Sequence, residues 1–408
     1  MNKATPILAI LVVVILAVTC AAVILNGHGN NGSNDGLPAY TIDGETDLAG
    51  NFYISFVYSK NLIMLDGKGN VVWSLHKDPD PSGNLGGCWD FKKHVIDGKT
   101  YYSYHEQDVS EDHYGINGYA PGDRVIMDSQ FNEVKRIRFE ESPTIPDVIW
   151  KNHPLDGHDF FLIDLNHYIM SGYVKGTVSN NPLVSGEHTV VYSYLQEVKD
   201  GNVIWEWRSV DYPELYSLTV TDAIATANDF ENLVTDAPDY VHFNAMRIND
   251  DGDLICSFRH LNTIMCLDRD ASMASGNQIL WKLSGNADEF GLTADQKTSS
   301  QHYVTVDGNV ITAFDNHNIT QETRLVRYTV DTANKTVTDF KAYRIDGKFS
   351  EACGSAQYLY GETYAIGWGA TKYVAVCMCV YDFSTDTQLI SMTLENAQNF
   401  TYRCVYYD

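Results

Sequence analysis

The stretch NLIMLDGKGNVVWSL, residues 61–75, decides how this chain folds, because it is one copy of a unit that recurs along the sequence. It contains an apolar strand, a turn built from Asp, Gly and Asn, and a second strand that carries a tryptophan. Such a pattern is typical of an antiparallel β-hairpin. Five further copies follow: RVIMDSQFNEVKRIRF (124–139), YSYLQEVKDGNVIWEW (192–207), TIMCLDRDASMASGNQILWKL (263–283), LVRYTVDTANKTVTDFKAY (325–343) and VCMCVYDFSTDTQLISMTL (376–394).

A second set of hairpins lies between these copies, and we call it the inner set. Its members are DFKKHVIDGKTYYSYHE (90–106), DFFLIDLNHYIMSGY (159–173), HFNAMRINDDGDLICSFR (242–259), HYVTVDGNVITAFDN (302–316) and SAQYLYGETYAIGWG (355–369). An inner and an outer hairpin together make a four-stranded unit, and radial repetition of such units is typical of a β-propeller. Six copies therefore predict an all-β fold, a six-bladed β-propeller over residues 39–408. We expect the segments near 39–60 and 398–408 to complete one blade together and close the ring.

The composition agrees with a large β domain and limits the function. Of 408 residues, 44% are hydrophobic and 12% aromatic, which is enough for a sizeable core rich in strands. The net charge of −25 excludes a nucleic-acid partner, since phosphate backbones require a clustered basic face. An anionic ester could bind only where a local cationic cluster overcomes that field.

The N-terminal segment predicts a membrane anchor. Residues 7–25 form a run of 19 residues without a charge, long enough to span a bilayer and longer than the usual core of a signal peptide. We therefore expect a transmembrane anchor or signal segment over 1–26 and a flexible linker over 27–38. The propeller would then lie on the extracytoplasmic side of the cell membrane. The alternative is secretion after cleavage of the segment.

Eight cysteines include Cys20 in the apolar segment, so seven remain, and an odd number leaves at least one unpaired. Cys256 and Cys266 lie on the two arms of one predicted hairpin, which places them near each other without requiring a bond. Cys377 and Cys379 point to the same face of a strand. We expect buried thiols there, because further metal ligands at useful spacing are lacking.

Three histidines and one arginine recur at matching places in the inner hairpins. His158, His242 and His302 each stand at the beginning of an inner strand, and Arg259 follows the partner strand of the hairpin that His242 begins. If the units sit around a ring, these four side chains converge on one funnel. Asn244, two residues after His242, is expected to point the same way on an extended strand. The polar stretch 209–239 directly precedes His242 and predicts an insertion, either a lid or a plain surface excursion.

These residue types suit chemistry on a tetrahedral anion. A neutral imidazole can attack an electrophilic sulfur or phosphorus, and the guanidinium fork of Arg259 matches the oxygens of sulfate or phosphate. The remaining histidines and Asn244 can stabilise oxygens as charge shifts. Zinc is a second interpretation of three histidines. The adjacent arginine disfavours it and no carboxylate is clearly part of the set, so we expect neither a metal nor another cofactor.

The sequence resembles the arylsulfotransferase family, whose members transfer sulfate without a nucleotide donor. The matching segments, in family order, are GHDFFLI (157–163), DYVHFNAM (239–246), DGDLICSFRHLNTI (251–264), ILWKLSG (279–285), QHYVTVDGNVITAFDN (301–316) and GSAQYLYGETYAIGWG (354–369). The resemblance implies a six-bladed propeller, in agreement with the repeats. It also implies a sulfotransferase that moves a sulfuryl group from an aryl sulfate ester to a phenol, both of them small molecules.

Carried over residue by residue, the resemblance makes His302 the nucleophile of a ping-pong reaction through a sulfohistidine. It implies that His158, His242 and Arg259 hold the sulfuryl oxygens and that Asn244 supports them in binding the substrate. His158 is our choice for acid–base help. The chain departs from the family pattern at Ala245, where a small hydroxyl residue is common. We also expect no counterpart of the family's N-terminal β-sandwich domain, since only the linker precedes the first predicted blade.

Two other functions compete with transfer. A non-catalytic propeller at the cell surface could bind a carbohydrate or protein partner, since propellers often serve as binding scaffolds. It would turn over no aryl sulfate. A sulfatase or phosphatase would use water in place of the phenol, and comparing free sulfate with sulfated phenol separates these two reactions.

Overall fold

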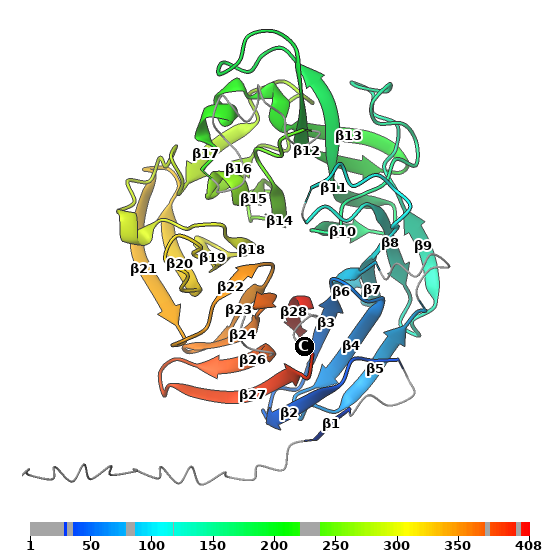
Figure 1. Ribbon diagram of the computed structural model, residues 1–408, viewed down its shortest axis with the longest axis vertical. Coiled ribbons are helices and arrows are strands. Elements are labelled where there is room, and N and C mark those ends of the chain that lie inside the picture. The colour runs from blue at the N-terminus through cyan, green and yellow to red at the C-terminus, as the bar shows by residue number, and fades with distance from the viewer. Residues whose placement is uncertain are drawn as a thin grey trace, which may run out of the picture.

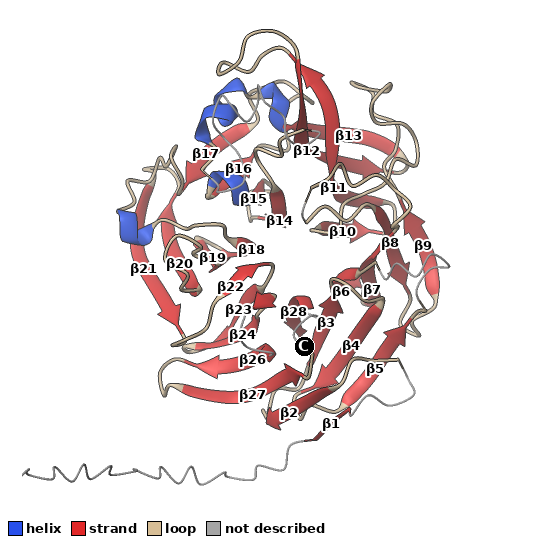
Figure 2. Ribbon diagram, viewed as in Figure 1, coloured by secondary structure: helices blue, strands red, loops and turns tan. Residues whose placement is uncertain are grey.

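The computed structural model describes residues 28–30, 36–78, 86–116, 118–220, 237–371, 376–396 and 401–408. These residues fold almost entirely into β-strands, with short 3-10 helices in connecting segments (Figure 2). Within the described residues the main strands form six groups of four antiparallel strands, arranged in a ring around a common centre (Figure 1). The all-β, propeller-like prediction is therefore confirmed.

The six groups are numbered in chain order, and the strands of each group are given from the innermost to the outermost. Group 1 comprises β28 (Thr401–Tyr407), β3 (Asn51–Phe56), β4 (Asn61–Asp66) and β5 (Val71–His76). Group 2 comprises β6 (Cys88–Ile96), β7 (Lys99–Gln107), β8 (Gly122–Met127) and β9 (Glu133–Ile137). Group 3 comprises β10 (Phe160–Asp164), β11 (His167–Val178), β12 (His188–Lys199) and β13 (Asn202–Arg208). Group 4 comprises β14 (Phe243–Ile248), β15 (Leu254–Phe258), β16 (Thr263–Leu267) and β17 (Ile279–Leu283).

The remaining elements complete the ring. Group 5 comprises β18 (His302–Asp307), β19 (Val310–Asp315), β20 (Arg324–Asp331) and β21 (Thr336–Arg344). Group 6 comprises β23 (Ser355–Tyr360), β24 (Thr363–Gly367), β26 (Val376–Asp382) and β27 (Thr387–Leu394), with β2 (Tyr40–Gly44) and β1 (His28–Asn30) at its outer edge. A small ladder joins β22 (Ser350–Ala352) to β25 (Ala370–Thr371). The 3-10 helices are η1 (Ser209–Asp211), η2 (Pro213–Leu218), η3 (Arg259–Leu261) and η4 (Ala294–Gln296).

Every hairpin predicted from the repeats is present, and the ring closes through the two ends of the chain. β28 pairs with β3, with Val405 opposite Tyr53. The segment 39–60 divides between two groups, however, because β2 pairs with β27 and places Ile42 opposite Met392. The ends therefore join neighbouring groups by backbone hydrogen bonds at two places.

The Asp that ends many outer strands explains why the turns recur. The side chain of Asp66 accepts hydrogen bonds from the backbone N–H groups of Lys68 and Asn70 at 2.9 and 2.8 Å. Asp128 holds its own turn in the same way, through Gln130 and Asn132. A side chain that caps its own turn fixes the hairpin register locally, so each unit can form before the ring closes.

The hydrophobic core lies between neighbouring groups around the ring. Tyr53 and Phe91 belong to the cluster between groups 1 and 2, and Ile255 and Val304 to the cluster between groups 4 and 5. Ile390 belongs to the cluster that packs group 6 against group 1. Middle strands such as β15 and β24 are buried throughout, whereas the outermost strands β5, β9 and β21 are largely exposed. Each sheet face is thus covered by the next group, which fixes where the innermost strands point.

Bulges interrupt the innermost strands close to their first residues. The register shifts between Trp89 and Lys92 in β6, between Phe243 and Ala245 in β14, and between His302 and Val304 in β18. Backbone conformations with positive φ accompany these shifts, at 50° for Asp90, 53° for His242 and 45° for Tyr303. Bulges of this kind re-aim side chains at functional sites. The alternation expected of a regular strand therefore does not hold at this end of the ring.

Seven cysteines lie in the described residues, and all are free thiols. Cys256 and Cys266 are on adjacent strands without a bond, and Cys377 and Cys379 are buried, as predicted. The apolar segment 7–25 and most of the linker lie outside the described residues, which hold no helix long and apolar enough to cross a membrane. Of the predicted insertion, η1 and η2 are described and residues 221–236 are not.

Candidate functional site

One side chain or backbone group from each of the six groups meets at the end of the ring where the inner strands begin. These entrance residues are Trp89, His158, His242, His302, Cys353 and Tyr402. The ring centroids of His158 and His242 are 4.9 Å apart at 89°, and Trp89 lies 5.7 Å from His158 and 4.7 Å from Tyr402. The predicted convergence of the histidines is thus confirmed for His158 and His242 by direct contact.

His302 joins the same site through electrostatics and through the chain that follows it. Its Nε2 accepts a hydrogen bond from the backbone N–H of Cys353 at 3.2 Å. Burial lowers the pKa of His302 well below its usual value, and the charges of Arg259, His158 and His242 lower it further. The imidazole of His302 is therefore neutral at pH 7.

The neighbours of His302 also fix its tautomer. Nδ1–H donates to Asn316 Oδ1 at 2.7 Å, and Asn316 Nδ2 donates in turn to the carbonyl oxygens of Ser350 and Cys353 at 2.9 and 3.2 Å. Because the amide nitrogen is committed to two carbonyls, its oxygen must be the atom that faces His302. The hydrogen of His302 therefore stands on Nδ1, and Nε2 carries the lone pair.

His158 and His242 have a different kind of partner. Nδ1 of His158 donates to the Asp156 carboxylate at 2.6 Å, and Nδ1 of His242 donates to the Asp239 carboxylate at 2.5 Å. A carboxylate on Nδ1 orients the ring and stabilises the imidazolium form, which an amide does not. The three histidines therefore differ in their partners: Nδ1 of His158 and Nδ1 of His242 face carboxylates, whereas Nδ1 of His302 faces an amide oxygen.

Glycines let His158 and His242, the two histidines that face carboxylates, approach the rest of the entrance. A Cβ on Gly157, between Asp156 and His158, would lie about 3.0–3.1 Å from His105 and Trp89. A Cβ on Gly118 would lie 3.2 Å from Cε1 of His242, and Gly118 adopts a φ of 92°. The rings of His158 and His242 therefore both approach Gly118, with the edges that do not bind the carboxylates.

Arg259 supplies positive charge beside these rings. It begins η3, its backbone N–H donates to His242 O at 2.8 Å, and its side chain is half-buried with Nη2 3.5 Å from Glu351 O. Burial, the His158 charge and then the Arg259 charge lower the pKa of His242. The guanidinium is the local cation that an anionic substrate requires in a chain of net charge −25.

Asn244 does not point towards the entrance as a regular strand would place it. The positive φ of His242 and the bulge after Phe243 break the two-residue alternation between His242 and Asn244. Its Nδ2 donates to Gln301 O at 2.7 Å, which braces the residue before His302, and Oδ1 is buried without a partner in the described residues. A substrate-binding role for Asn244 remains a prediction.

The sequence argument missed the carboxylates of this site. Asp156 and Asp239 bind His158 and His242 directly, so the expectation that no carboxylate belongs to the set was wrong. The signals were local, an Asp two residues before His158 and another three before His242. Asn316 and the Cys353 N–H, by contrast, reach His302 only through the folded ring.

Asp239, His242 and His260 lie close enough to be considered as metal ligands. Two ligands of one tetrahedral zinc ion are about 3.3 Å apart, since each bond is about 2.0–2.2 Å long. Nδ1 of His242 stands only 2.5 Å from Asp239 Oδ2, and Nδ1 of His260 donates to Asp239 O at 2.7 Å. These distances fit a hydrogen-bonded relay rather than a metal shell.

A cluster of buried ion pairs lies directly behind the entrance. Asp90 binds Lys92, Arg124 and Arg403 at 2.9, 2.8 and 2.8 Å. Asp159, the residue after His158, binds Lys92 and lies 3.0 Å from Arg247 and 3.5 Å from Arg403. We call these six residues the ion cluster. Apart from Arg124 on β8, its members follow the entrance residues along the innermost strands, so the cluster lies between the entrance and the far ends of these strands.

Comparisons with known proteins give one family match and several structural likenesses. Residues 109–375 match the family model described as arylsulfotransferase (ASST). No curated protein matches the sequence of this chain. A protein of unknown function from Bacteroides caccae is similar in structure, with 7% sequence identity over 88% of this chain and 99% of the other, and a TM-score of 0.48. Virginiamycin B lyase from Staphylococcus aureus shares 11% identity over 87% of this chain and 99% of the other, with a TM-score of 0.36.

Proposed function

The chain belongs to the arylsulfotransferase family, and on this premise we propose that it transfers a sulfuryl group from an aryl sulfate ester to a phenol through a sulfohistidine at His302. The observation that carries the proposal is the difference between the histidines. His302 is neutral with its lone pair on Nε2, whereas His158 and His242 are backed by carboxylates. We also propose that the six groups are the blades of a six-bladed propeller.

In the first half-reaction, the donor displaces the Cys353 N–H from His302 Nε2, and the freed lone pair attacks the sulfur of the donor. The N–S bond forms as the bond between sulfur and the aryl oxygen breaks, and the departing aryloxide takes a proton from the His158 imidazolium. The hydrogen on His302 Nδ1 stays with Asn316 throughout. The products are a free phenol, a neutral His158 and a sulfuryl group on His302.

In the second half-reaction, an acceptor phenol gives its proton to His158 and its oxygen attacks the sulfur. The N–S bond breaks, and His302 returns to its neutral state. Arg259 and His242 stand where they can bind the sulfuryl oxygens in both steps, since their charges already act on His302. This assignment of roles implies ping-pong kinetics: the sulfuryl group moves first from the donor to His302 and then from His302 to the acceptor phenol.

The location of the protein follows as a further part of the proposal. The uncharged run 7–25 would anchor the chain in the cell membrane, with the propeller on the extracytoplasmic side.

The test is transfer from 4-nitrophenyl sulfate to a phenol by the His302→Asn variant. Asn retains polarity but has no imidazole nitrogen, so the proposal predicts loss of both 4-nitrophenol release and sulfated product. Gln130→Asn, at an exposed turn of group 2, is the matched control and should transfer at the wild-type rate. Full activity in His302→Asn would refute the nucleophile. Release of inorganic sulfate without sulfated phenol would show a sulfatase, and no turnover in the wild type would favour a binding propeller.

A further inference from the structure

A second pocket lies at the opposite end of the ring from the histidines. It has a volume of about 430 Å³, within the range of small-molecule sites. Its wall is formed by later residues of the same inner strands, among them Lys93, Phe160, Arg247, Tyr303 and Tyr407. The ion cluster stands between this pocket and the entrance, so the two sites are separate.

The pocket is cationic although the chain as a whole is strongly acidic. In the ion cluster, the four cations Lys92, Arg124, Arg247 and Arg403 face only the two carboxylates Asp90 and Asp159. No third carboxylate in the described ranges forms an ion pair with any of the four. Burial alone would raise the pKa of Asp159, but Lys92, Arg247 and Arg403 lower it. The pKa of Asp90 is lowered in the same way, so both carboxylates are ionised and already paired with cations of the cluster.

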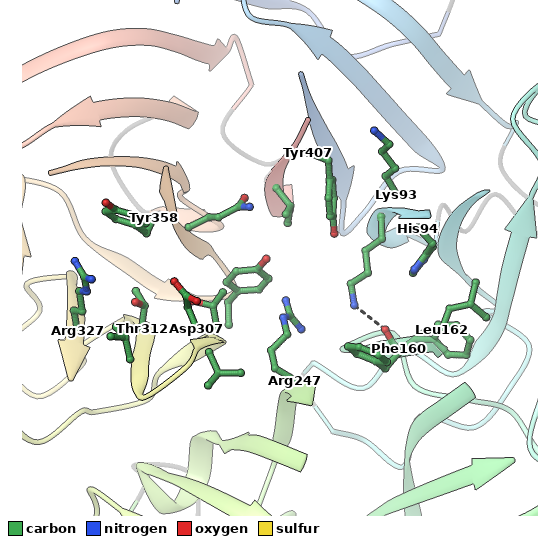
Figure 3. Close-up of a pocket in the computed structure, with 18 residues that line it drawn as sticks. Lys93, His94, Phe160, Leu162, Arg247, Asp307, Thr312, Arg327, Tyr358 and Tyr407 are labelled. Atoms are coloured by element: carbon green, nitrogen blue, oxygen red, sulfur yellow. Dashed lines mark hydrogen bonds between the residues drawn. The ribbon is translucent and has the colours of Figure 1, made fainter. Parts of the chain in front are cut away.

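Arg247 carries this excess charge to the pocket. Its Nη1 donates to Asp159 at 3.0 Å, its guanidinium lies 4.7 Å from the Tyr303 ring centroid, and 17% of its side chain remains exposed. Figure 3 shows the Arg247 guanidinium between Phe160 and Leu162 on one side and Asp307, Arg327 and Tyr358 on the other. Burying a cation without a full counter-charge is costly, so an anion at this point would be bound strongly.

A second arginine and the aromatic wall limit what kind of anion fits. Arg327 lies 4.9 Å from the Tyr358 ring centroid and forms no ion pair with a carboxylate of the described residues. Tyr358 and Tyr407 offer partly exposed ring surface in this wall, whereas Tyr303 and Phe160 are each only 2% exposed and already lie against arginines. Aromatic rings pack well against such faces, and the guanidinium fork pairs with planar carboxylates.

We propose that this pocket binds a small aromatic anion, with the anionic group at Arg247 and the ring beside Tyr358 and Tyr407. The site is distinct from the histidine entrance and does not depend on sulfuryl transfer. Asp307 is the one acidic side chain in the wall, and it is exposed at the rim. It opposes the binding of an anion.

The experiment is isothermal titration calorimetry of the full chain with 4-nitrobenzoate, which is neither a sulfuryl donor nor a phenol. The proposal predicts one saturable site for 4-nitrobenzoate. The dissociation constants of 4-nitrobenzamide and of cyclohexanecarboxylate should be at least tenfold higher. Arg247→Met should weaken binding about tenfold, since a charged hydrogen bond contributes that factor. Arg344→Met, at the exposed end of β21, is the matched control and should leave binding unchanged.

Two further variants keep the result interpretable. Asp307→Asn should tighten binding by a factor of about two to five, because it removes a like charge at a solvent-exposed rim, and misfolding cannot produce a gain. His302→Asn should bind as the wild type does. The proposal is overturned if wild-type protein shows no saturable binding, if the neutral amide binds equally well, if Asp307→Asn gives no gain, or if His302→Asn abolishes binding.

Discussion

Replacing Asn316 with Leu tests the basis on which His302 is assigned as the nucleophile. Leu has the same branched heavy-atom skeleton as Asn but cannot accept the hydrogen bond from His302 Nδ1–H or donate to the carbonyls of Ser350 and Cys353. Without that acceptor, the hydrogen on Nδ1 keeps only the longer contact with Ser300 O at 3.2 Å, so a larger fraction of His302 carries its hydrogen on Nε2 and lacks the lone pair of the attacking atom. The ring also loses the contact that fixes its orientation.

The structure gives the expected magnitudes. Three hydrogen bonds are lost, and at a net contribution of about 0.5–1.5 kcal/mol for each we expect a loss of about 1.5–4.5 kcal/mol in the free energy of unfolding. Loss of the correct tautomer costs about 100- to 10,000-fold in the rate of an imidazole-dependent reaction. The fall in rate should therefore be far larger than any fall in the fraction folded.

The assay is rapid-mixing measurement of 4-nitrophenol release from an aryl sulfate, beside thermal unfolding of the same samples. Asn318→Leu is the matched control, since Asn318 lies two residues on and donates to Glu351 O rather than to His302. We expect it to keep the burst rate within about threefold. If Asn316→Leu remains folded and releases 4-nitrophenol at the wild-type rate, the tautomer argument is refuted.

Three other outcomes follow from the same geometry. Asp156→Asn removes the carboxylate that supports the His158 imidazolium, so transfer should fall about 100- to 10,000-fold, with the largest loss for donors whose phenol is a poor leaving group; an equal loss for every leaving group would contradict His158 as the acid. Gly157→Ala places a Cβ about 3.0–3.1 Å from His105 and Trp89, and should lower the free energy of unfolding by about 1–3 kcal/mol in denaturant titrations, whereas Gly201→Ala, with open space around it, should show only the cost of its positive φ. Burial lowers the pKa of His94, His105 and His260 to about 3, so the unfolded chain binds more protons below about pH 6.5, and stability should fall as the pH drops from 7 towards 4; unfolding temperatures that stay level or rise over this range would exclude these shifts.

Much of the fold could be predicted from the sequence because its determinants are local. The apolar alternation and the Asp that caps its own turn, as at Asp66, lie within one hairpin and therefore appear in the sequence as a repeat. The place of His158 and His242 at the start of their strands followed from the same repeat. Ring closure was predicted, but the pairing of β2 with the last group was not, because nothing local favours one edge over the other.

The chemistry of the site was less predictable, because it depends on contacts between groups. The partner of His302 stands 14 residues away on the far strand of its hairpin, and the Cys353 N–H comes from the next group. Asn244 was misplaced because a bulge and a positive φ at His242 cannot be read from residue types. The ion cluster brings Asp90 and Arg403 together across 313 residues, which only the closed ring allows.

The central claim is that His302 accepts the sulfuryl group. The most direct measurement is peptide mass spectrometry of the full chain after brief treatment with an aryl sulfate donor and no acceptor. The samples are kept at a pH where the N–S bond of a sulfohistidine survives. The account predicts a single sulfuryl adduct on the peptide that contains His302, which disappears when a phenol is added and sulfated phenol forms in equal amount. An adduct on His158 or His242 in place of His302, or sulfated phenol without any enzyme adduct, would contradict it.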